Sequence, residues 1–250
     1  MTDHAAEELL AEIRAFCAAH ADPQVAARYA RYFKEGYDPY GVPEEAWPGI
    51  REEWVARYRD RLGLAGFLDL GGELFASGKY EEGGLAIRLI AQFKGEFDRA
   101  TFQRLGRWLE AVRNWAHCDV LCGDLLSWFL TAGLASLDDM GDWRTSPAKY
   151  KRRAVPVAMI GVLKETKDVG PLLDFIRPLM TDPERVVQQG LGWFLREAWK
   201  RWPGPVETFL LEWKDTAPRL IFQYATEKMS PEAKARFRRR NSPLRKPMVG

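Results

Sequence analysis

Apolar side chains recur along this chain at intervals of three and four residues, which is the period of an α-helix. In residues 184–202, "ERVVQQGLGWFLREAWKRW", the pattern gives an apolar stripe that would face the core of the protein. The members of this stripe are Val187, Leu191, Phe194, Leu195, Ala198 and Trp202. Alternating patterns bounded by turns, which would indicate β-strands, are almost absent. The hydrophobic pattern therefore predicts an all-α protein.

Residues that begin and end helices divide the chain into about a dozen helices of roughly 10 to 20 residues each. Asp22 followed by Pro23 is a typical helix start, because aspartate caps the first turn and proline fits the first helical position. Asp182 followed by Pro183 gives the same signal, and Gly63 lies between two helical runs, where it predicts a stop. Many short helices without a sheet indicate an α-solenoid or a globular helical bundle.

The composition is that of a soluble globular protein, with 46% hydrophobic and 29% charged residues. We assign residues 1–240 to a single helical domain and residues 241–250 to a basic C-terminal tail. The longest apolar stretch, residues 154–163, is too short to span a bilayer, and the acidic N-terminus is unlike a signal peptide. Three cysteines form no disulfide framework. We therefore expect a cytoplasmic monomer that does not enter membranes.

Basic residues are concentrated in two places, although the net charge of the chain is only +2. Residues 228–246 contain eight basic residues and one acidic residue, and Lys149, Lys151, Arg152 and Arg153 form a cluster near a predicted helix start. Lysine and arginine bind the phosphates of nucleic acids, and arginine does so with two parallel hydrogen bonds. A solvated cationic surface is the alternative for each cluster, so charge alone leaves both interpretations open.

The helix predicted after Pro183 carries a second stripe, which points away from its apolar one. This stripe consists of Gln189, Trp193, Arg196 and Lys200. An aromatic ring among cations suits nucleic acid, because the cations pair with phosphates and the ring packs against a sugar or base. Alternatively, a neighbouring helix covers Trp193 and the residue is part of the packing between helices.

The segment Asn114–Leu130, "NWAHCDVLCGDLLSWFL", places a carboxylate on a largely apolar helix. Trp115 and Asp119 are four residues apart, so they share one face of that helix. A carboxylate on an apolar face is costly unless it is paired or takes part in chemistry. Asp119 is therefore either a structural carboxylate or a catalytic one.

Other kinds of site lack the residues that they require. His117, Cys118 and Cys122 lie close together in the sequence, but no second pair of histidines or cysteines completes a tetrahedral metal site. The chain contains no Gly-rich phosphate loop and no Gly-x-Ser-x-Gly nucleophile turn. We therefore expect neither a metal nor a cofactor.

Several of these stretches, taken in order, resemble the bacterial DNA alkylation repair enzymes, the AlkD-like alkylpurine DNA glycosylases built from HEAT-like repeats. The similar stretches are "ARYFKEGYDPYGVP", "LFASGKYEEGGLAI", "NWAHCD", "KRRAV" and "VVQQGLGWFLREAWKRWP". The resemblance covers most of the chain and implies a right-handed superhelical α-solenoid of HEAT-like repeats. It also implies a concave, positively charged face that binds double-stranded DNA.

The resemblance further implies a catalytic cleft made of two tryptophans, one aspartate and one arginine. These fall on Trp115, Asp119, Trp193 and Arg153. The arginine would instead be Arg152 if the register shifts by one residue. The family often carries another aspartate or tryptophan inside the Trp-x-x-x-Asp element, where this chain has Ala116, His117 and Cys118. The family is thought to act on the deoxyribose without a pocket for the base, and we find no pocket motif in the sequence.

Two functions from different classes are compatible with these patterns. The first is a DNA repair glycosylase that releases N3- or N7-alkylated purines, whose positive charge makes them good leaving groups. Asp119 and the tryptophans would then stabilise the oxocarbenium-like sugar. The alternative is a non-catalytic HEAT-repeat protein that binds or scaffolds structured or damaged DNA. In either case we expect DNA contacts from Lys149, Lys151, Arg152, Gln189, Arg196 and Lys200.

Overall fold

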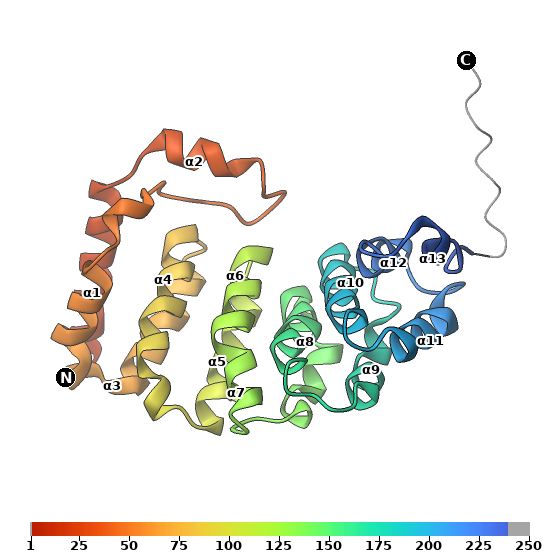
Figure 1. The fold of residues 1–250 in the computed structure, drawn as a ribbon. Helices are drawn as coiled ribbons and strands as arrows, with labels where there is room; N and C mark the ends of the chain where they lie inside the picture. The colour runs from red at the N-terminus through yellow and green to blue at the C-terminus, as the bar shows by residue number, and fades with distance from the viewer. Residues whose placement is uncertain (1, 240–250) are drawn as a thin grey trace, which may run out of the picture.

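The structure, a computed structural model, describes residues 2–239, which fold into a curved row of helices (Figure 1). Its α-helices are α1 (Thr2–Ala19), α2 (Pro23–Ala30), α3 (Ile50–Ala76), α4 (Tyr80–Ile90), α5 (Arg99–Ala111), α6 (Trp115–Leu121), α7 (Ser127–Thr131), α8 (Lys149–Val162), α9 (Gly170–Ile176), α10 (Arg185–Trp199), α11 (Pro203–Trp213), α12 (Arg219–Ala225) and α13 (Pro231–Ala235). Within residues 2–239 there is no strand, and the prediction of an all-α fold is confirmed. The tail predicted for residues 241–250 lies outside the described part of the chain.

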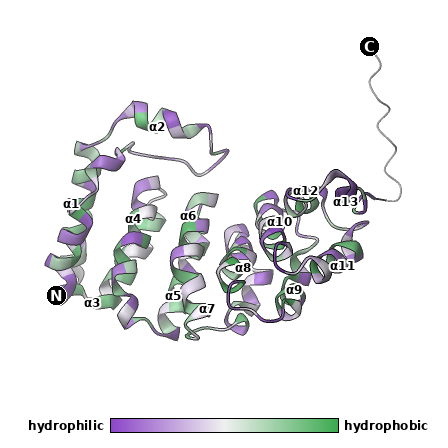
Figure 2. Ribbon diagram, in the orientation of Figure 1, coloured by the Kyte–Doolittle hydropathy of each residue, from purple (hydrophilic) through white to green (hydrophobic). Residues whose placement is uncertain are grey.

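The helices pack in a regular order along the row. In one layer α4 contacts α6, α6 contacts α8, α8 contacts α10, and α10 contacts α12. A second layer includes α3 with α5 and α9 with α11. Most helices carry both apolar and polar segments, as Figure 2 shows, which is expected when one side of each helix faces a shared core. Whether these helix pairs are HEAT-like repeats stays a prediction.

The helix boundaries predicted at Asp22, Gly63 and Pro183 agree with the structure to within two residues. Asp22 caps α2 by accepting a hydrogen bond from the backbone N–H of Gln24, and Pro23 is the first residue of that helix. Gly63 interrupts α3 with a backbone φ of 58°, a conformation that favours glycine. The helix expected after Pro183 begins at Arg185. None of the helices in residues 2–239 is both long and apolar enough to cross a membrane.

The long helix predicted around Asp119 contains a short π-helix, Cys122–Leu126, between α6 and α7. Three side chains on this composite helix donate hydrogen bonds to successive carbonyls of α8. The bonds run from Cys118 to Tyr150 at 3.4 Å, from Cys122 to Ala154 at 3.7 Å, and from Ser127 to Ala158 at 2.7 Å. The acceptors are four residues apart, whereas the last two donors are five apart. The extra residue of the π-helix therefore brings Ser127 into register with α8.

Residues 22–43, which we call the N-terminal strap, lie between α1 and α3 in the chain and include α2. The Glu81 carboxylate accepts hydrogen bonds from three successive backbone N–H groups, those of Tyr40, Gly41 and Val42, at 2.7 to 3.2 Å. Gly36 lies so close to the backbone of Arg113 that an added Cβ would be 2.0 Å from its carbonyl oxygen. The strap is thereby fixed over the N-terminal ends of α4 and α6 (Figure 1).

Candidate active site

Asp119 and Arg153 form a two-point ion pair between α6 and α8. Arg153 Nε donates to Asp119 Oδ1 and Arg153 Nη2 donates to Asp119 Oδ2, each at 2.8 Å. The Asp119 side chain is 15% exposed and that of Arg153 is 6% exposed. Two parallel hydrogen bonds fix the plane of the carboxylate as well as its position. The structure therefore brings together two of the four residues predicted for the catalytic cleft.

Arg153 also connects these helices to α10. Its Nη1 donates to the carbonyl of Val186, and its side chain packs against Gly190, where an added Cβ would meet Arg153 Cγ at 3.2 Å. Burial raises the pKa of Asp119, and the hydrogen bonds and charge of Arg153 oppose that rise. Arg153 thus orients the carboxylate and favours its charged form.

Trp115 lies one helical turn before Asp119 and remains 41% exposed. Its indole N–H donates to the carbonyl of Tyr32 in the strap at 3.2 Å, and its ring stacks on Phe33 with 5.5 Å between centroids. The strap therefore holds one side of the indole and leaves the rest open to a ligand. An exposed aromatic ring beside a carboxylate suits a cationic sugar, because both groups attract positive charge.

His117 lies between these two residues in the sequence but serves the fold. Its Nε2 is 2.8 Å from the carbonyl of Tyr80, and its Nδ1 is 3.1 Å from Nδ2 of Asn114. A carbonyl only accepts, so Nε2 carries the proton and Nδ1 accepts from Asn114. Burial lowers the pKa of His117 to about 4. The ring is therefore neutral and fully hydrogen-bonded, so it has no free nitrogen for acid–base chemistry.

Arg152, the alternative match for the catalytic arginine, pairs with a different aspartate. Its guanidinium donates to both oxygens of Asp182, at 2.6 and 3.3 Å, and also to the carbonyls of Ser146 and Pro147. Asp182 in turn accepts from the backbone N–H of Glu184 just before α10. The geometry thus associates Arg153 with Asp119 and gives Arg152 a bracing position between α8 and α10.

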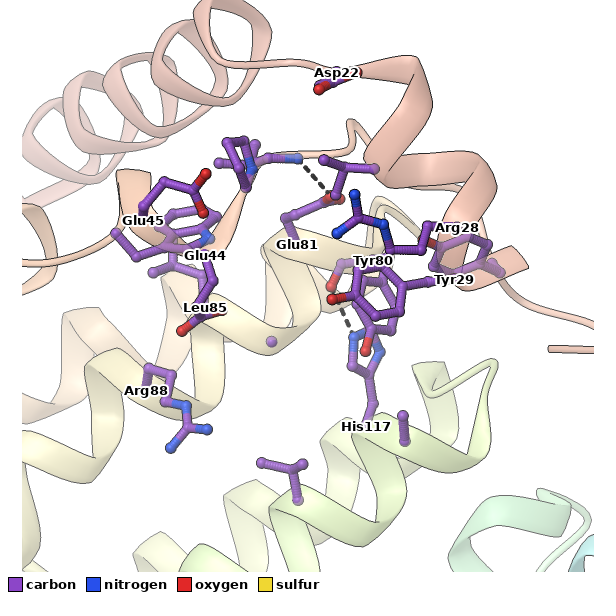
Figure 3. Close-up of a pocket in the computed structure, with 18 of the residues that line it drawn as sticks. Asp22, Arg28, Tyr29, Glu44, Glu45, Tyr80, Glu81, Leu85, Arg88 and His117 are labelled. Atoms are coloured by element: carbon purple, nitrogen blue, oxygen red, sulfur yellow. Dashed lines mark hydrogen bonds between the residues drawn. The ribbon is translucent and has the colours of Figure 1, made fainter. Parts of the chain in front are cut away.

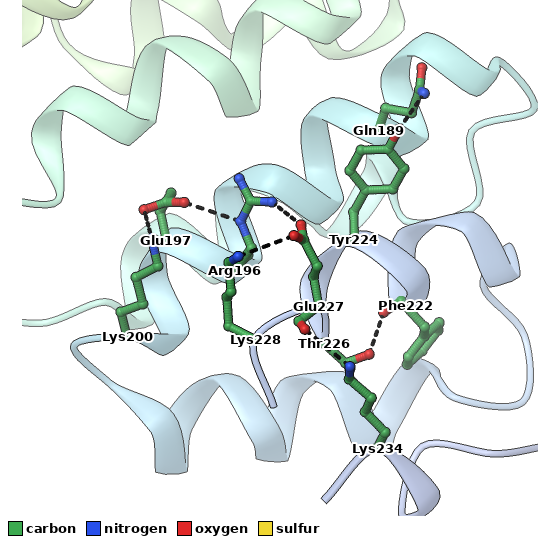
Figure 4. Close-up of polar contacts among 10 residues, drawn as sticks. All are labelled: Gln189, Arg196, Glu197, Lys200, Phe222, Tyr224, Thr226, Glu227, Lys228 and Lys234. Carbon is green, nitrogen blue, oxygen red and sulfur yellow. Dashed lines mark hydrogen bonds and ion pairs between the residues drawn. The ribbon is translucent and has the colours of Figure 1, made fainter. Parts of the chain in front are cut away.

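The cations predicted to contact DNA are paired with carboxylates in the structure. The pairs are Lys149 with Glu35, Lys151 with Glu110, Arg152 with Asp182, Arg196 with Glu197 and Glu227, and Lys200 with Glu197. Figure 4 shows the last of these around α10, where Gln189 also donates to the Tyr224 hydroxyl at 2.7 Å. A phosphate would have to take the place of these carboxylates, so their removal should affect DNA binding.

Trp193 lies on α10 and is half-buried against the core. On the same stripe, Gln189 and Arg196 contact Tyr224 and Glu227, so this side of α10 faces α12 and the turn after it (Figure 4). Among residues 2–239, Trp193 makes no hydrogen bond or ring contact with Trp115, Asp119 or Arg153. Its role in the cleft stays a prediction.

A cavity of about 500 Å³ lies between the strap and helices α4 and α6 (Figure 3). Ala116 and Val120 line it from α6, and each immediately follows a candidate site residue, Trp115 or Asp119. One residue along a helix is a rotation of about 100°, so the cavity adjoins the candidate site on its neighbouring side. The sequence does not reveal this cavity, because its lining comes from segments that are far apart in the chain.

The comparisons with known proteins agree with this architecture. A family model described as DNA alkylation repair enzyme matches residues 13–229. A solved structure described as a predicted DNA alkylation repair enzyme from Enterococcus faecalis has a similar fold, with a TM-score of 0.67 and 18% identity over 85% of this chain and 98% of that one. A search of curated proteins returns no match. Because the family model spans most of the chain and includes the candidate site, the protein belongs to the DNA alkylation repair enzyme family.

Proposed function

We propose that this protein is a DNA glycosylase that releases positively charged N3- or N7-alkylated purines from double-stranded DNA. The observation that carries the proposal is the Asp119 carboxylate, held by Arg153 one turn from the exposed ring of Trp115. Membership of the DNA alkylation repair family supports DNA as the substrate. The residues needed for this chemistry are all side chains of the protein, and the proposal invokes no cofactor.

The chemistry follows from the charge of the lesion. An alkylated purine that carries a positive charge leaves as a neutral base, so its departure needs no proton from the enzyme. The bond between sugar and base then breaks toward an oxocarbenium-like sugar, as in the hydrolysis of other glycosidic bonds. Water adds to this sugar to complete the hydrolysis. The enzyme therefore has to stabilise a cation and position a water molecule.

Asp119 is suited to both tasks. Arg153 occupies one hydrogen-bonding position on each carboxylate oxygen, and a carboxylate oxygen accepts more than one hydrogen bond. The remaining acceptor positions are available to the sugar cation or to the attacking water. Fixing the carboxylate beforehand avoids reorganisation during the reaction, which is the basis of electrostatic catalysis. Arg153 acts here as a positioning residue, because its donors are used by Asp119 and Val186.

Trp115 would place its ring against the deoxyribose. A cation over an indole face is stabilised by about 0.5 to 2 kcal/mol, and the exposed indole needs no rearrangement to accept one. Trp193 is proposed as the second ring on the α10 side of the cleft. Lys149, Lys151, Arg196 and Lys200 are proposed to bind phosphates after exchanging their present carboxylate partners.

The direct experiment is to incubate the protein with methylated duplex DNA and identify the released bases by chromatography. We expect release of N3- and N7-methylpurines at rates above their spontaneous loss. A duplex that contains uracil is the matched control, since uracil is neutral and requires help in leaving. Release of uracil as fast as methylpurines would contradict the proposed mechanism, and release of neither base would contradict the function.

A further inference from the structure

Arg113 is an exposed arginine two residues before α6 begins, and its charge has no partner. Within residues 2–239 its guanidinium makes no hydrogen bond and no ion pair. The cations that the sequence analysis assigned to DNA are instead all paired with carboxylates. A phosphate can therefore bind to Arg113 directly, whereas at each of those cations it first has to displace a carboxylate.

The position of Arg113 is fixed by two glycines that lie against it. A Cβ added to Gly36 of the strap would be 2.0 Å from the Arg113 carbonyl oxygen, and one added to Gly78 would be 3.1 Å from Arg113 Nη1. The two glycines have φ values of 65° and 77°, which favour glycine. The guanidinium is thus confined before any ligand binds, so binding costs less conformational entropy.

A hollow of about 430 Å³ that Arg113 lines contains charged groups of both signs. Glu35, which also lines it, pairs with Lys149 at 2.7 Å. Glu110, on the same hollow, pairs with Lys151 at 2.6 Å. The two carboxylates are thus balanced by two lysines, and Arg113 adds a third cation. The hollow therefore has an excess of positive charge, which suits an anion.

Arg113 is also held at a fixed offset from Trp115. Between them Asn114, which is 1% exposed, caps α6 and donates through Nδ2 to the carbonyl of Gly36 at 3.0 Å. The indole of Trp115 donates to another strap carbonyl, that of Tyr32. Two residues span at most about 7 Å of chain. Each deoxyribose within a strand is bonded to two phosphates, so a sugar against Trp115 places a phosphate within reach of Arg113.

We propose that Arg113 binds a phosphate of the damaged strand next to the sugar that Trp115 contacts. Arginine suits this role, because its planar guanidinium donates two parallel hydrogen bonds to one phosphate. The contact holds the deoxyribose near Asp119 through the strand itself, so it requires no pocket for the base. The inference rests on the proposed function for the presence of DNA, and it adds a phosphate site that fixes the position of the sugar.

The experiment measures binding to duplex DNA in which one nucleoside is replaced by tetrahydrofuran, a stable analogue of the deoxyribose, by fluorescence anisotropy. Arg113→Gln should weaken binding by about tenfold, which corresponds to about 1.4 kcal/mol, and should make the dependence of log affinity on log salt shallower by about 0.9. Arg113→Lys keeps the charge and should lose less. Arg107→Gln is the matched control, because Arg107 of α5 is exposed and has no ion pair within residues 2–239.

Modified duplexes identify the phosphate that Arg113 contacts. In two further duplexes, an uncharged methylphosphonate replaces the phosphate on the 5′ or on the 3′ side of the tetrahydrofuran. On one of these duplexes Arg113→Gln should cause almost no further loss of affinity, because both changes remove the same contact. Equal losses from Arg113→Gln on all three duplexes, or a loss as large from Arg107→Gln, would overturn the phosphate site. Thermal melting checks that each variant is folded.

Failure of this inference can be told apart from failure of the proposed function, because release of methylpurines is measured on the same proteins. If the wild type releases them and Arg113→Gln binds and excises as Arg107→Gln does, the phosphate site is overturned and the glycosylase stands. Coupling between Arg113 and one phosphate, without any release by the wild type, would do the reverse. A wild type that neither binds DNA nor releases methylpurines would overturn both.

Discussion

Two adjacent arginines of α8 make ion pairs of the same type that differ in what surrounds them. Arg153 binds both oxygens of Asp119, and Arg152 binds both oxygens of Asp182. Asp182 is 5% exposed in its side chain and accepts a further hydrogen bond from the backbone N–H of Glu184. In this second pair both partners are used by the local fold, so it acts as a brace between helices.

In the first pair, the carboxylate of Asp119 keeps hydrogen-bond acceptor positions that no residue of the described chain fills. Among residues 2–239, the Asp119 carboxylate has no hydrogen-bond partner other than Arg153, and its side chain is 15% exposed. It also has an exposed indole one turn away, whereas Asp182 does not. A buried ion pair alone says little about function, since proteins also use such pairs for structure. The remaining acceptor capacity and the neighbouring aromatic surface distinguish the candidate site from the brace.

The largest change in stability that we expect comes from breaking either ion pair. It should be similar for the two pairs. Asp119→Asn and Asp182→Asn each leave a buried guanidinium without its charged partner. Losing one member of a buried ion pair costs about 3 to 5 kcal/mol, so both variants should have a lower free energy of unfolding by similar amounts. Chemical denaturation of both proteins measures this. An Asp119→Asn variant as stable as the wild type would show that Arg153 does not depend on that carboxylate.

The next effect concerns His117, which resembles Asp182 in having every polar atom engaged. Its folded pKa of about 4 lies below the ordinary value near 6.5, so the unfolded chain binds more protons between these pH values. Stability is therefore complete above pH 6.5 and falls as the pH decreases toward 4, by about 3 kcal/mol. Denaturation at several pH values measures this loss. His117→Gln, which cannot be protonated, should lose less stability than the wild type over the same range.

A smaller effect is expected from Trp115, the exposed neighbour of Asp119. Trp115→Ala removes an indole that contributes about 1 to 2 kcal/mol to binding a cationic sugar, so excision should slow by about tenfold. Its melting temperature should fall somewhat, because the indole also bonds to Tyr32 and stacks on Phe33, so excision is compared well below the melting temperature. Trp199→Ala is the control: that indole is bonded to Glu207 at 3.0 Å and lies near the end of α10. Loss of excision in Trp199→Ala alone would contradict the site.

The smallest effect tests the carboxylates that hold the proposed phosphate-binding lysines. Glu35 accepts hydrogen bonds from Lys149 and from the hydroxyl of Tyr150, at 2.9 and 3.0 Å. Glu35→Gln should increase the affinity for duplex DNA by about two- to fivefold at low salt, and the gain should shrink as salt is added. Fluorescence anisotropy with labelled DNA measures this. Glu53→Gln, on α3, is the control, and an equal gain there would make the effect one of net charge.

The fold was largely predictable from the sequence, because amphipathic helices reveal their period and their caps locally. Asp22 and Gly63 act where the sequence placed a helix start and a stop. The choice between Arg152 and Arg153 was not predictable from the residues, since one position on a helix changes the direction of a side chain by about 100°. The π-helix after α6 also has one extra residue in its helical turn, and the hydrophobic pattern of the sequence does not reveal it.

Contacts between distant segments explain what the sequence could not predict. Glu35 and Lys149 are 114 residues apart, so nothing local indicates that the predicted phosphate ligand is already paired. The cavity likewise lies between the strap and helices α4 and α6, which are distant in the sequence. Nothing in the local sequence around Gly84 indicates that this residue lines a cavity. The candidate catalytic residues were named only through the family resemblance, and of these the structure brings Asp119 and Arg153 into contact.

The most direct measurement of the central claim is single-turnover release of N7-methylguanine from duplex DNA by Asp119→Asn and Asp182→Asn, well below their melting temperatures. The two variants lose the same charge and leave the same kind of buried arginine. We predict that Asp119→Asn is slower than the wild type by at least about a hundredfold, since removing one preorganised electrostatic group costs about 3 to 4 kcal/mol. We predict that Asp182→Asn excises at the wild-type rate. Wild-type excision by folded Asp119→Asn would contradict the catalytic assignment and make both aspartates braces.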